Sequence, residues 1–460
     1  MSTAIATLLS RLTSVLPADA LHHDDASRIA YSYDNSRRQS LPDAVALPNT
    51  LEQIGTIVAY CAELRVPLVA RGRGTNTTGA SVPVAAGLVL SCERMQRIIE
   101  VDPEDRVAVV EAGVLNGDLQ QAAAAHGLFF APDPTSAAFC SIGGNLACNA
   151  GGPRAVKYGA ARDNTLALRC VDGRGTLHRL GSRTTKGATG YDLMRLVIGS
   201  EGTLAVIGEA TLKLLPLPQS LRTLRALYRD VESAAAAVAR IMRQPQIPCA
   251  LEFMDAEAVR LAREIGGADI PPAGALLMIE VDGAEAAIDL AVAAVSAAAT
   301  GDGLLQLDAA QSAAEVARLW AARKALSPAL KQIAPRKINE DVVVPVSQLP
   351  ALVAKTRALA EASGIAIVCF GHAGNGNLHV NLMFDPGNEA QASQAPRVLA
   401  ELFATTIALG GTLSGEHGIG LEKRDFMPLA IAAPTLELMR AVKAQFDPHG
   451  ILNPGKLLPA

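Results

Sequence analysis

Two short segments near the carboxyl end of the chain concentrate residue types that bind metals and move protons. His372 and His379 bracket a turn-rich stretch in GHAGNGNLHVN, and Glu416 and His417 are adjacent in SGEHGIG. Two imidazoles and a carboxylate, with coordination positions left over, are a ligand set typical of catalytic sites for borderline divalent metals. An imidazole beside such a site, as His417 would be, can act as a general base near neutral pH.

The same histidines also have an ordinary interpretation. Polar residues often flank a turn between two strands, and a pair of histidines alone does not distinguish that arrangement from a metal site. A metal site requires Glu416 to lie beside the histidines in space, which spacing along the chain does not establish. Features elsewhere in the sequence must therefore decide between the two interpretations.

Length and composition indicate more than one domain and large buried cores. The chain has 460 residues, of which 50% are hydrophobic, and a formal net charge of -4; such a length exceeds that of one ordinary domain. Charges of both signs are interleaved and aromatic residues make up only 3%. A nucleic-acid partner is therefore not expected, because neither a basic surface nor a base-stacking platform is indicated.

The distribution of apolar residues and cysteines bears on the compartment. No run of about 18 uninterrupted apolar residues occurs, so no transmembrane helix is expected. The apolar run near the N-terminus follows no basic segment, which favours an amphipathic helix over a secretory signal. Seven scattered cysteines without a CxxC pair support neither a zinc ribbon nor an iron-sulfur cluster, and fit a reducing compartment. We expect a cytoplasmic protein.

The order of expected elements divides the chain into four parts. Residues 1–40 form an N-terminal helical segment, and residues 41–218 begin with a β-α-β pattern whose helix opens at Asn49-Thr50. In residues 219–425, alanine-rich amphipathic helices alternate with strands, which predicts an α+β domain with an antiparallel sheet covered on one face. Residues 426–460 are a helix followed by a proline-containing tail.

Two long loops rich in glycine and small polar residues lie in the first main domain. They are RGRGTNTTGAS, residues 71–81, and PDPTSAAFCSIGGNLACNAGGPRAVKYG, residues 132–159. Neither is a Walker A loop or the GxGxxG of a Rossmann turn. Backbone N–H groups in such loops can surround a pyrophosphate, whereas a single glycine loop is more often a plain turn. Both interpretations stay open for the pair.

Motifs along nearly the whole chain resemble a flavoprotein superfamily. RGRGTNTTGA, PDPTS with SIGGNLACNAGG, and TGYDLMRLVIGSEGTLAVIGEATLKLLP are similar to the FAD-binding domain of the vanillyl-alcohol oxidase and p-cresol methylhydroxylase superfamily. WAARKAL, FGHAGNGNLHVN, SGEHGIGLEKRDF and FDPHGILNPGKLLP resemble its D-2-hydroxyacid dehydrogenase branch, which includes D-lactate, glycolate and D-2-hydroxyglutarate dehydrogenases. The resemblance implies an α+β fold, with a two-subdomain FAD-binding domain of the p-cresol methylhydroxylase type and a ferredoxin-like substrate domain.

The resemblance also implies the cofactor contacts. The two glycine loops would hold the FAD diphosphate, a later segment would meet the adenosine half, and the tail would return toward the isoalloxazine. The implied residues are Arg71, Gly72, Arg73, Gly74, Thr75, Asn76, Thr78, Gly79, Pro132, Thr135, Gly143, Gly144, Asn145, Gly152, Glu201, Gly202, Ile207 and Asn453. Some superfamily members tether FAD through a histidine in the first loop, and this loop has none, so non-covalent FAD is expected.

In the second half, the resemblance assigns a metal centre and a substrate site. The implied ligands of one divalent metal, Zn or Mn, are His372, His379 and Glu416, and the implied substrate contacts are Arg323, Ser327, Lys337, Asn381 and His417. Arg323 would clamp the substrate carboxylate, a task that suits a bidentate guanidinium. In the implied reaction, a metal-chelated 2-hydroxy acid loses its hydroxyl proton to His417 and its α-hydrogen as hydride to flavin N5. The product is a 2-oxo acid.

Two departures from the family pattern bear on the substrate. Asn375 replaces the aspartate of the usual GHxGDGN loop, which reduces negative charge at a position that is not a ligand. Asn339 stands two residues before Asp341, where D-2-hydroxyglutarate enzymes present a lysine. D-lactate or another small monocarboxylate is therefore favoured. D-2-hydroxyglutarate is the alternative, and it would need Lys337 or Arg336 to reach the second carboxylate.

Functions of other kinds stay open. A non-catalytic flavin electron-transfer subunit would keep the glycine loops and lose the catalytic half, which is intact here, and an oxidase would pass electrons directly to oxygen. The sequence does not name the electron acceptor, which is expected to be a quinone, a cytochrome or an electron-transfer flavoprotein. A homodimer and a peripheral association with the inner face of the membrane are both compatible with the resemblance.

Overall fold

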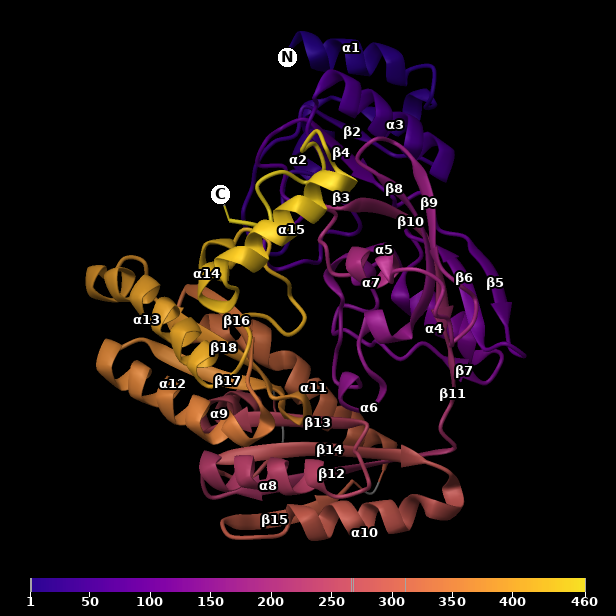
Figure 1. Ribbon diagram of the computed structural model, residues 1–460. Helices are drawn as coiled ribbons and strands as arrows, with labels where there is room; N and C mark the ends of the chain where they lie inside the picture. Colours follow the sequence, from indigo (N-terminus) through magenta and orange to yellow (C-terminus); the bar gives the residue numbers. More distant parts are fainter. Residues whose placement is uncertain (1, 266, 268, 311, 460) are drawn as a thin grey trace. The chain divides into compact units, whose positions relative to one another are not determined.

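The computed structural model describes residues 2–265, 267, 269–310 and 312–459, with all their side chains except those of Ala322, Lys324, Ala325, Ser327 and Pro328. These residues form two compact units (Figure 1). The first unit comprises Met1–Gly151, Gly159–Leu217 and Glu416–Ala460, and the second comprises Gly152–Tyr158 and Pro218–Gly415. Among the described residues, no helix combines the length and the apolar composition needed to cross a bilayer.

The first unit contains three sheets. Its strands are β1 (Leu21–His22), β2 (Ala44–Ala46), β3 (Leu68–Arg71), β4 (Leu88–Ser91), β5 (Ile98–Asp102), β6 (Val107–Glu111), β7 (Leu128–Phe129), β8 (Thr165–Asp172), β9 (Leu177–Gly181), β10 (Ala205–Lys213) and β11 (Leu215–Pro216). They pair in the orders β1-β2-β4-β3, β5-β6-β10-β8-β9 and β11-β7. The four-stranded and five-stranded sheets have separate hydrophobic cores, so the unit consists of two subdomains.

The helices of the first unit are α1 (Thr3–Leu12), α2 (Asp25–Ala30), α3 (Leu51–Leu64), α4 (Asn116–Ala124), α5 (Ile142–Cys148), α7 (Leu193–Val197), α14 (Met427–Ala430) and α15 (Ala433–Phe446). The predicted β-α-β start is confirmed, because α3 connects β2 and β3, which both lie parallel to β4. The Thr50 hydroxyl caps α3 by accepting from the Gln53 N–H at 3.2 Å. Strand β3 then runs directly into the first glycine loop.

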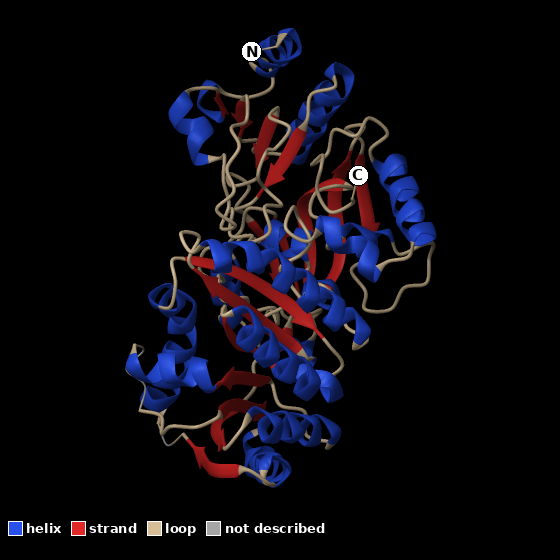
Figure 2. Ribbon diagram, turned by 90° about the vertical axis from the view of Figure 1, so that its left-hand side faces the viewer, coloured by secondary structure: helices blue, strands red, loops and turns tan. Residues whose placement is uncertain are grey.

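The second unit is built on one antiparallel sheet of seven strands in the order β15-β12-β14-β13-β17-β18-β16 (Figure 2). These strands are β12 (Ser220–Tyr228), β13 (Ala250–Asp255), β14 (Ala275–Gly283), β15 (Leu304–Ala309), β16 (Arg336–Val343), β17 (Ala366–His372) and β18 (Asn377–Phe384). The helices are α6 (Ala155–Tyr158), α8 (Val231–Arg243), α9 (Ala256–Glu264), α10 (Ile288–Ala299), α11 (Ala313–Ala329), α12 (Leu349–Ser363) and α13 (Glu389–Ala408).

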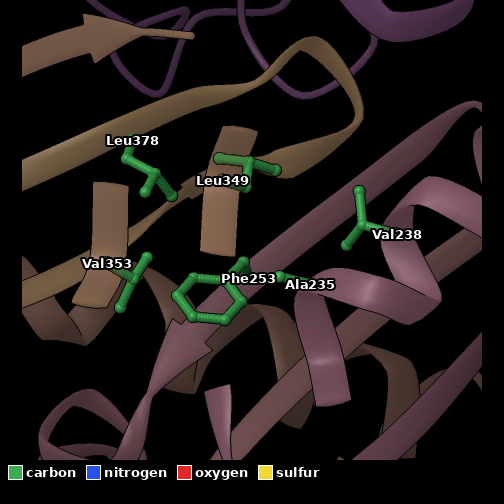
Figure 3. Close-up of a pocket in the computed structure, with 6 residues that line it drawn as sticks. All are labelled: Ala235, Val238, Phe253, Leu349, Val353 and Leu378. Carbon is green, nitrogen blue, oxygen red and sulfur yellow. The ribbon is translucent and has the colours of Figure 1, made fainter. Parts of the chain in front are cut away.

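Helices cover both faces of this sheet, so the expectation of one covered face is wrong. Met254 packs in a core with α9 and α11, whereas its neighbour Phe253 lines a small apolar cavity with Ala235 and Val238 of α8 and with residues of α12 and β18 (Figure 3). Successive strand residues point to opposite faces. The cavity, of about 10 Å³, is too small for an organic ligand and is a packing void.

Besides a one-residue shift at Pro218, the units differ from the sequence-based division in two places. Residues 152–158 of the second glycine loop fold with the second unit, and residues 416–425 fold with the first. Long-range polar contacts explain both placements. The Lys157 ammonium and the Tyr158 hydroxyl donate to Asp282 at the end of β14, the latter at 2.6 Å. The N–H groups of Ile419 and Gly420 donate to Glu201 at 2.6 and 2.8 Å.

Candidate active site

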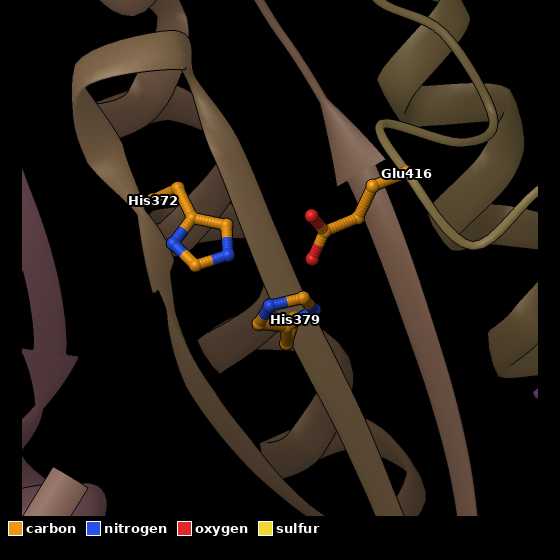
Figure 4. Close-up of side chains that lie close together, drawn as sticks. All are labelled: His372, His379 and Glu416. Carbon is orange, nitrogen blue, oxygen red and sulfur yellow. The ribbon is translucent and has the colours of Figure 1, made fainter. Parts of the chain in front are cut away.

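Two histidines and one glutamate converge where β17 ends and β18 begins (Figure 4). His372 is the last residue of β17, His379 is the third of β18, and a short 3-10 turn, Ala373–Asn375, lies between them. One potential ligand atom from each of His372, His379 and Glu416 lies within 4.8 Å of the others. Both imidazoles are buried, with ring centroids 5.2 Å apart in an edge-to-face arrangement. The donor set and its spacing therefore suit one divalent ion.

The turn between the two histidines depends on glycine. Gly376 has a φ of +72°, and a Cβ at this position would collide with the carbonyl oxygen of Val344. Phe370 pairs directly with His379 in the β17–β18 ladder, so the tight turn fixes how far the two histidines lie apart. The two histidines thus flank a turn between strands, and they also lie close enough to share a metal ion. Both interpretations of the pair are consistent with the structure, because the turn between the strands brings the imidazoles together.

Asp341 of β16 holds the chain immediately before Glu416. Its carboxylate accepts from the Ser414 hydroxyl at 3.0 Å and from the Gly415 N–H at 2.9 Å, and Asp341 lies directly opposite His379 in the β16–β18 ladder. The side chain is fully buried. A buried carboxylate that is hydrogen-bonded in this way fixes the backbone that carries the third ligand.

Glu252 of β13 contacts two of the residues that the sequence predicts for the site. One oxygen, Oε1, lies 2.5 Å from His372 Nδ1, while Oε2 accepts from Arg323 Nε at 2.9 Å and lies 2.8 Å from its Nη2. Burial works to raise the pKa of Glu252, but the nearby His372 and Arg323 outweigh it, and the pKa is lowered. The Arg323 guanidinium also stacks on Phe370, with its central carbon 4.6 Å from the ring centroid.

Sequence reasoning missed Glu252, although a signal for it was present. It is the one acidic residue in the middle of CALEFM, a run that otherwise reads as buried strand. A charge in such a position requires a partner, which is a reason to look for one. The sequence does not show which residue is the partner of Glu252, because Glu252 meets His372 only through the pairing of β13 with β17.

The other predicted substrate residues lie on β16, β18 and α11. Asn381 is fully buried; its Nδ2 donates to the carbonyls of Val368 and His379, and its Oδ1 has no hydrogen-bond partner in the described part of the chain. Asn339 pairs with Asn381, and Lys337 lies two pairs further from His379, on the same face of β16 as Asn339. The side chain of Ser327 lies outside the described residues.

The two glycine loops of the first unit meet at positions where a side chain would not fit. A Cβ on Gly72 would lie 2.5 Å from Ser141 Oγ and 3.6 Å from Gly144, and a Cβ on Gly143 would lie 2.7 Å from that of Ala112. Backbone, and not side chain, therefore lines the junction of the loops. An extended anion such as a diphosphate fits such a surface, because exposed peptide N–H groups can donate to it.

Several side chains predicted to contact the cofactor make hydrogen bonds that hold the loops together. Arg71 donates to the carbonyl of Tyr33 at 2.7 Å and lies beneath its own loop, against Gly74; burial lowers the pKa of Arg71. Asn76 Nδ2 donates to the carbonyl of His417 at 3.1 Å, and its Oδ1 accepts from the Thr78 N–H at 2.9 Å. The first loop is thereby joined to the segment that carries His417.

Glu201 and Asn453 were expected to meet the adenosine and the isoalloxazine, respectively. In the structure Glu201 accepts from backbone N–H groups, and Asn453 contacts backbone carbonyls and the Lys456 ammonium. Both oxygens of Glu201 accept from the 419–420 backbone, and burial raises the pKa of this carboxyl. Asn453 Nδ2 donates to the carbonyls of Ala80 and Glu201 at 2.8 and 2.6 Å. These amide and carboxylate groups tie the tail and the 416–420 segment to the first loop.

The remaining predicted cofactor residues are spread over the loops and the five-stranded sheet. Arg73, Thr75, Thr78 and Gly79 are in the first loop, Pro132, Thr135, Gly143, Gly144 and Asn145 are in the second loop with α5, Gly202 precedes β10, Ile207 is buried within β10, and Gly152 falls in the second unit. The buried Asn116 joins part of the second loop, because its Nδ2 donates to the Pro132 carbonyl and to Asn145 Oδ1. Its own Oδ1 has no partner among the described residues.

Lys456 gives a prediction on the pH dependence of stability. Its ammonium is buried, donates to Asn453 Oδ1 at 3.0 Å, and burial lowers its pKa to about 8. An unfolded lysine has a pKa of about 10.4. Between about pH 8 and about pH 10.4, Lys456 is therefore more protonated in the unfolded chain than in the folded protein. The free energy of unfolding of the wild type should therefore rise with pH relative to Lys456→Met, by up to roughly 3 kcal/mol. Urea denaturation at pH 7.5 and pH 10 measures this, and an equal pH dependence in both proteins would contradict it.

Comparison with known proteins identifies the family. A family model of FAD binding domains matches residues 42–181, and a second, for the C-terminal domain of FAD linked oxidases, matches residues 217–457. The chain belongs to the FAD-linked oxidase family. The glycolate oxidase subunit GlcD of Bacillus subtilis (strain 168) is 38% identical over 97% of this chain and 96% of its own length. The D-lactate dehydrogenase of Anaerostipes hadrus is 33% identical over 96% of this chain and 94% of its own.

The solved structures establish the fold of this FAD-linked oxidase family member. The structure of p-cresol methylhydroxylase with substrate bound superposes with a TM-score of 0.83 over 100% of this chain and 98% of that chain, at 15% identity. The predicted p-cresol methylhydroxylase-type FAD-binding fold is thereby confirmed. The protein is an FAD-dependent oxidoreductase, and the backbone-lined junction of its glycine loops fits FAD.

Proposed function

We propose that this protein is an FAD- and metal-dependent dehydrogenase that oxidises D-lactate, or a similarly small 2-hydroxy acid such as glycolate, to the 2-oxo acid. The observation that carries the proposal is the convergence of His372, His379 and Glu416, with ligand atoms within 4.8 Å of one another. The names of the relatives, glycolate oxidase subunit and D-lactate dehydrogenase, support the substrate class.

The residues of the chain would divide the chemistry as follows. When bound, FAD supplies a two-electron acceptor at flavin N5 for the α-hydrogen of the substrate. When bound, a divalent ion supplies positive charge that lowers the pKa of the substrate hydroxyl. His372, His379 and Glu416 hold that ion, and His417 accepts the hydroxyl proton at an imidazole nitrogen. Asn381 Oδ1, buried and unpaired in the described part of the chain, offers an acceptor to the substrate.

Arg323 would bind the substrate carboxylate. Its contacts with Glu252 use Nε and one Nη, and a guanidinium has five N–H donors, so donors are left for a second carboxylate. Its position between the Glu252 carboxylate and the Phe370 ring fixes the plane of the group before a substrate arrives. Such preorganisation reduces the entropy cost of binding.

The substrate is proposed to be small because of β16. The second carboxylate of D-2-hydroxyglutarate would need a positively charged side chain to bind it. Asn339, which lies two residues before Asp341 on β16, is uncharged. D-2-hydroxyglutarate, which would give 2-oxoglutarate, is the second candidate, since Lys337 lies two residues from Asn339 on the same strand face. A non-catalytic electron-transfer role would not require the metal cluster.

A panel of substrates with an artificial dye acceptor, assayed under nitrogen, tests the proposal. We expect D-lactate or glycolate to give the highest kcat/KM, with L-lactate as the stereochemical control. A kcat/KM for D-2-hydroxyglutarate about a hundredfold above that for D-lactate would reverse the preference, by about 2.7 kcal/mol of transition-state stabilisation. If no 2-hydroxy acid bleached the flavin, the dehydrogenase proposal itself would fail, and rapid bleaching reversal in air would indicate an oxidase.

A further inference from the structure

We propose that Glu252 is a positioning residue that joins the metal-binding and the substrate-binding parts of the site, so that affinity for the metal and affinity for the substrate carboxylate both depend on this one side chain. The inference rests on the proposed function and extends it to a residue outside the ligand set. The two oxygens of the Glu252 carboxylate contact two different functional groups.

The contacts of Glu252 are divided between its two oxygens. Oε1 contacts His372 Nδ1 at 2.5 Å, and Oε2 receives Nε and Nη2 of Arg323 at 2.9 and 2.8 Å. Only 1% of Glu252 is exposed, so water does not compete for these oxygens. Glu252 and His372 are also directly opposite in the β13–β17 ladder, and the backbone pairing holds the carboxylate and the imidazole at fixed separation.

The contact with His372 selects the ring nitrogen that is available to a metal. A carboxylate at Nδ1 accepts the proton of that nitrogen, which leaves the lone pair on Nε2 and fixes the orientation of the ring. The ring of His379 lies edge-on to that of His372 at 5.2 Å. A rotation of His372 would therefore change the spacing between the two imidazole ligands as well as its own direction.

The contact with Arg323 has a second, electrostatic consequence for the metal. In the wild type the guanidinium and the Glu252 carboxylate neutralise each other. Without the carboxylate charge, Arg323, whose side chain is 12% exposed, would place an uncompensated positive charge beside the same histidine that binds the cation. The guanidinium would also lose the partner that, together with Phe370, fixes its plane. The metal would bind more weakly because of this charge. The substrate would also bind more weakly, because the loss of a fixed guanidinium plane and of the metal that chelates the substrate outweighs the added attraction of the charge for a carboxylate.

A neighbouring glutamate provides a matched control. Glu280 of β14 is also buried, and it accepts from the Thr223 hydroxyl at 2.8 Å and from the Trp320 indole N–H at 2.7 Å. Trp320 lies on α11, the helix that also carries Arg323. Glu280→Gln thus removes a charge from the same sheet and beneath the same helix without removing a group that touches His372 or Arg323.

The test compares purified Glu252→Gln and Glu280→Gln holoproteins with the wild type. We expect Glu252→Gln to weaken Zn²⁺ binding, measured by competition with a chromogenic chelator, by roughly 10–100-fold. The KM for D-lactate should rise by a similar factor, with a smaller change in kcat, because the substrate carboxylate is bound before the chemical step. Glu280→Gln should keep both quantities within about twofold of the wild type.

A second variant separates positioning from folding. Glu252→Asp keeps the charge but is one methylene shorter, so its carboxylate cannot reach both partners, and it should weaken metal binding less than Glu252→Gln. The rise in melting temperature on addition of Zn²⁺, measured for each variant, reports metal binding without reference to activity. If Glu252→Gln folds poorly, the shift in melting temperature of Glu252→Asp still tests whether this side chain affects metal binding.

The outcomes distinguish the inference from the function on which it rests. A wild type that binds Zn²⁺ and needs it, together with a Glu252→Gln variant of unchanged metal affinity, would overturn the inference and leave the function intact. Equal losses of metal in Glu252→Gln and Glu280→Gln would show a structural role and also overturn it. A wild type that is fully active after complete metal removal would overturn the proposed metal centre, and the inference with it.

Discussion

Replacement of His379 by alanine should remove the bound divalent metal from the purified protein and lower kcat/KM for D-lactate by about 10³-fold or more. Three ligands are the minimum that leaves a catalytic ion held with open positions, and His379 is one of the two buried imidazoles of the cluster. A metal that polarises a substrate oxygen contributes several kcal/mol to transition-state stabilisation; about 4 kcal/mol corresponds to the stated loss. Elemental analysis and steady-state kinetics measure the two effects.

The control for this experiment is His449→Ala, since His449 is an exposed histidine in the turn after α15. This variant should keep about one metal per chain and the activity of the wild type. Treatment of the wild type with a chelator should reproduce the loss seen in His379→Ala, and added Zn²⁺ or Mn²⁺ should restore the chelated wild type but not the variant. Full activity in a metal-free His379→Ala protein would rule out the proposed centre.

His417→Asn should lower kcat by about 10²–10⁴-fold while metal content and FAD content stay unchanged. The expected size is that of a general base removed from a proton-transfer step, and His417 is not among the cluster whose ligand atoms converge. Asparagine preserves much of the polar surface, so the 416–420 segment should keep its contacts through the His417 carbonyl, which accepts from Asn76. Stopped-flow bleaching of the flavin by D-lactate isolates the affected step.

Added imidazole provides the sharper readout for His417. A small base that enters the vacated space should raise the rate of the variant in proportion to its concentration and leave the wild type unaffected. The exposed His126 gives a matched variant, His126→Gln, for which no change is expected. A His417→Asn enzyme that bleaches its flavin within about threefold of the wild-type rate would require a different base, since general-base contributions are larger.

Local sequence signals predicted the first unit's opening elements, because these depend on short segments. The set of His372, His379 and Glu416 was implied by the family resemblance, since spacing along the chain does not bring Glu416 to the histidines. The Thr50 cap and the strand that leads into the glycine loop are set by neighbouring residues. The supporting carboxylates were not predictable in this way. Glu252 contacts a histidine 120 residues away, and Asp341 accepts from a serine 73 residues away. Only the pairing of segments far apart in the sequence brings these residues together.

One error was avoidable from the sequence. All six residues of β13 are buried, and a continuous buried strand, without alternation of polar and apolar residues, indicates a sheet covered on both faces. The expectation of one covered face was based on the alternation of amphipathic helices with strands, which does not indicate how many faces of the sheet the helices cover. Arg71 and Glu201 illustrate what a sequence motif does not specify. The motif identifies the residue, but it does not indicate whether the side chain or the backbone of that residue faces the cofactor.

The division of the chain into interleaved segments has a consequence for biosynthesis. The tail lies beside β3, where the Leu68 N–H donates to the Ile451 carbonyl at 2.8 Å and the Asn453 N–H donates to the Leu68 carbonyl at 2.7 Å. Domains generally fold in the order in which the ribosome releases them. Here all residues of the second unit have been synthesised once Gly415 is added. The first unit begins earlier in the sequence but also needs residues 416–460, which are synthesised afterwards. While the second unit is being synthesised, the first unit therefore lacks residues 416–460 and the hydrogen bonds between the tail and β3.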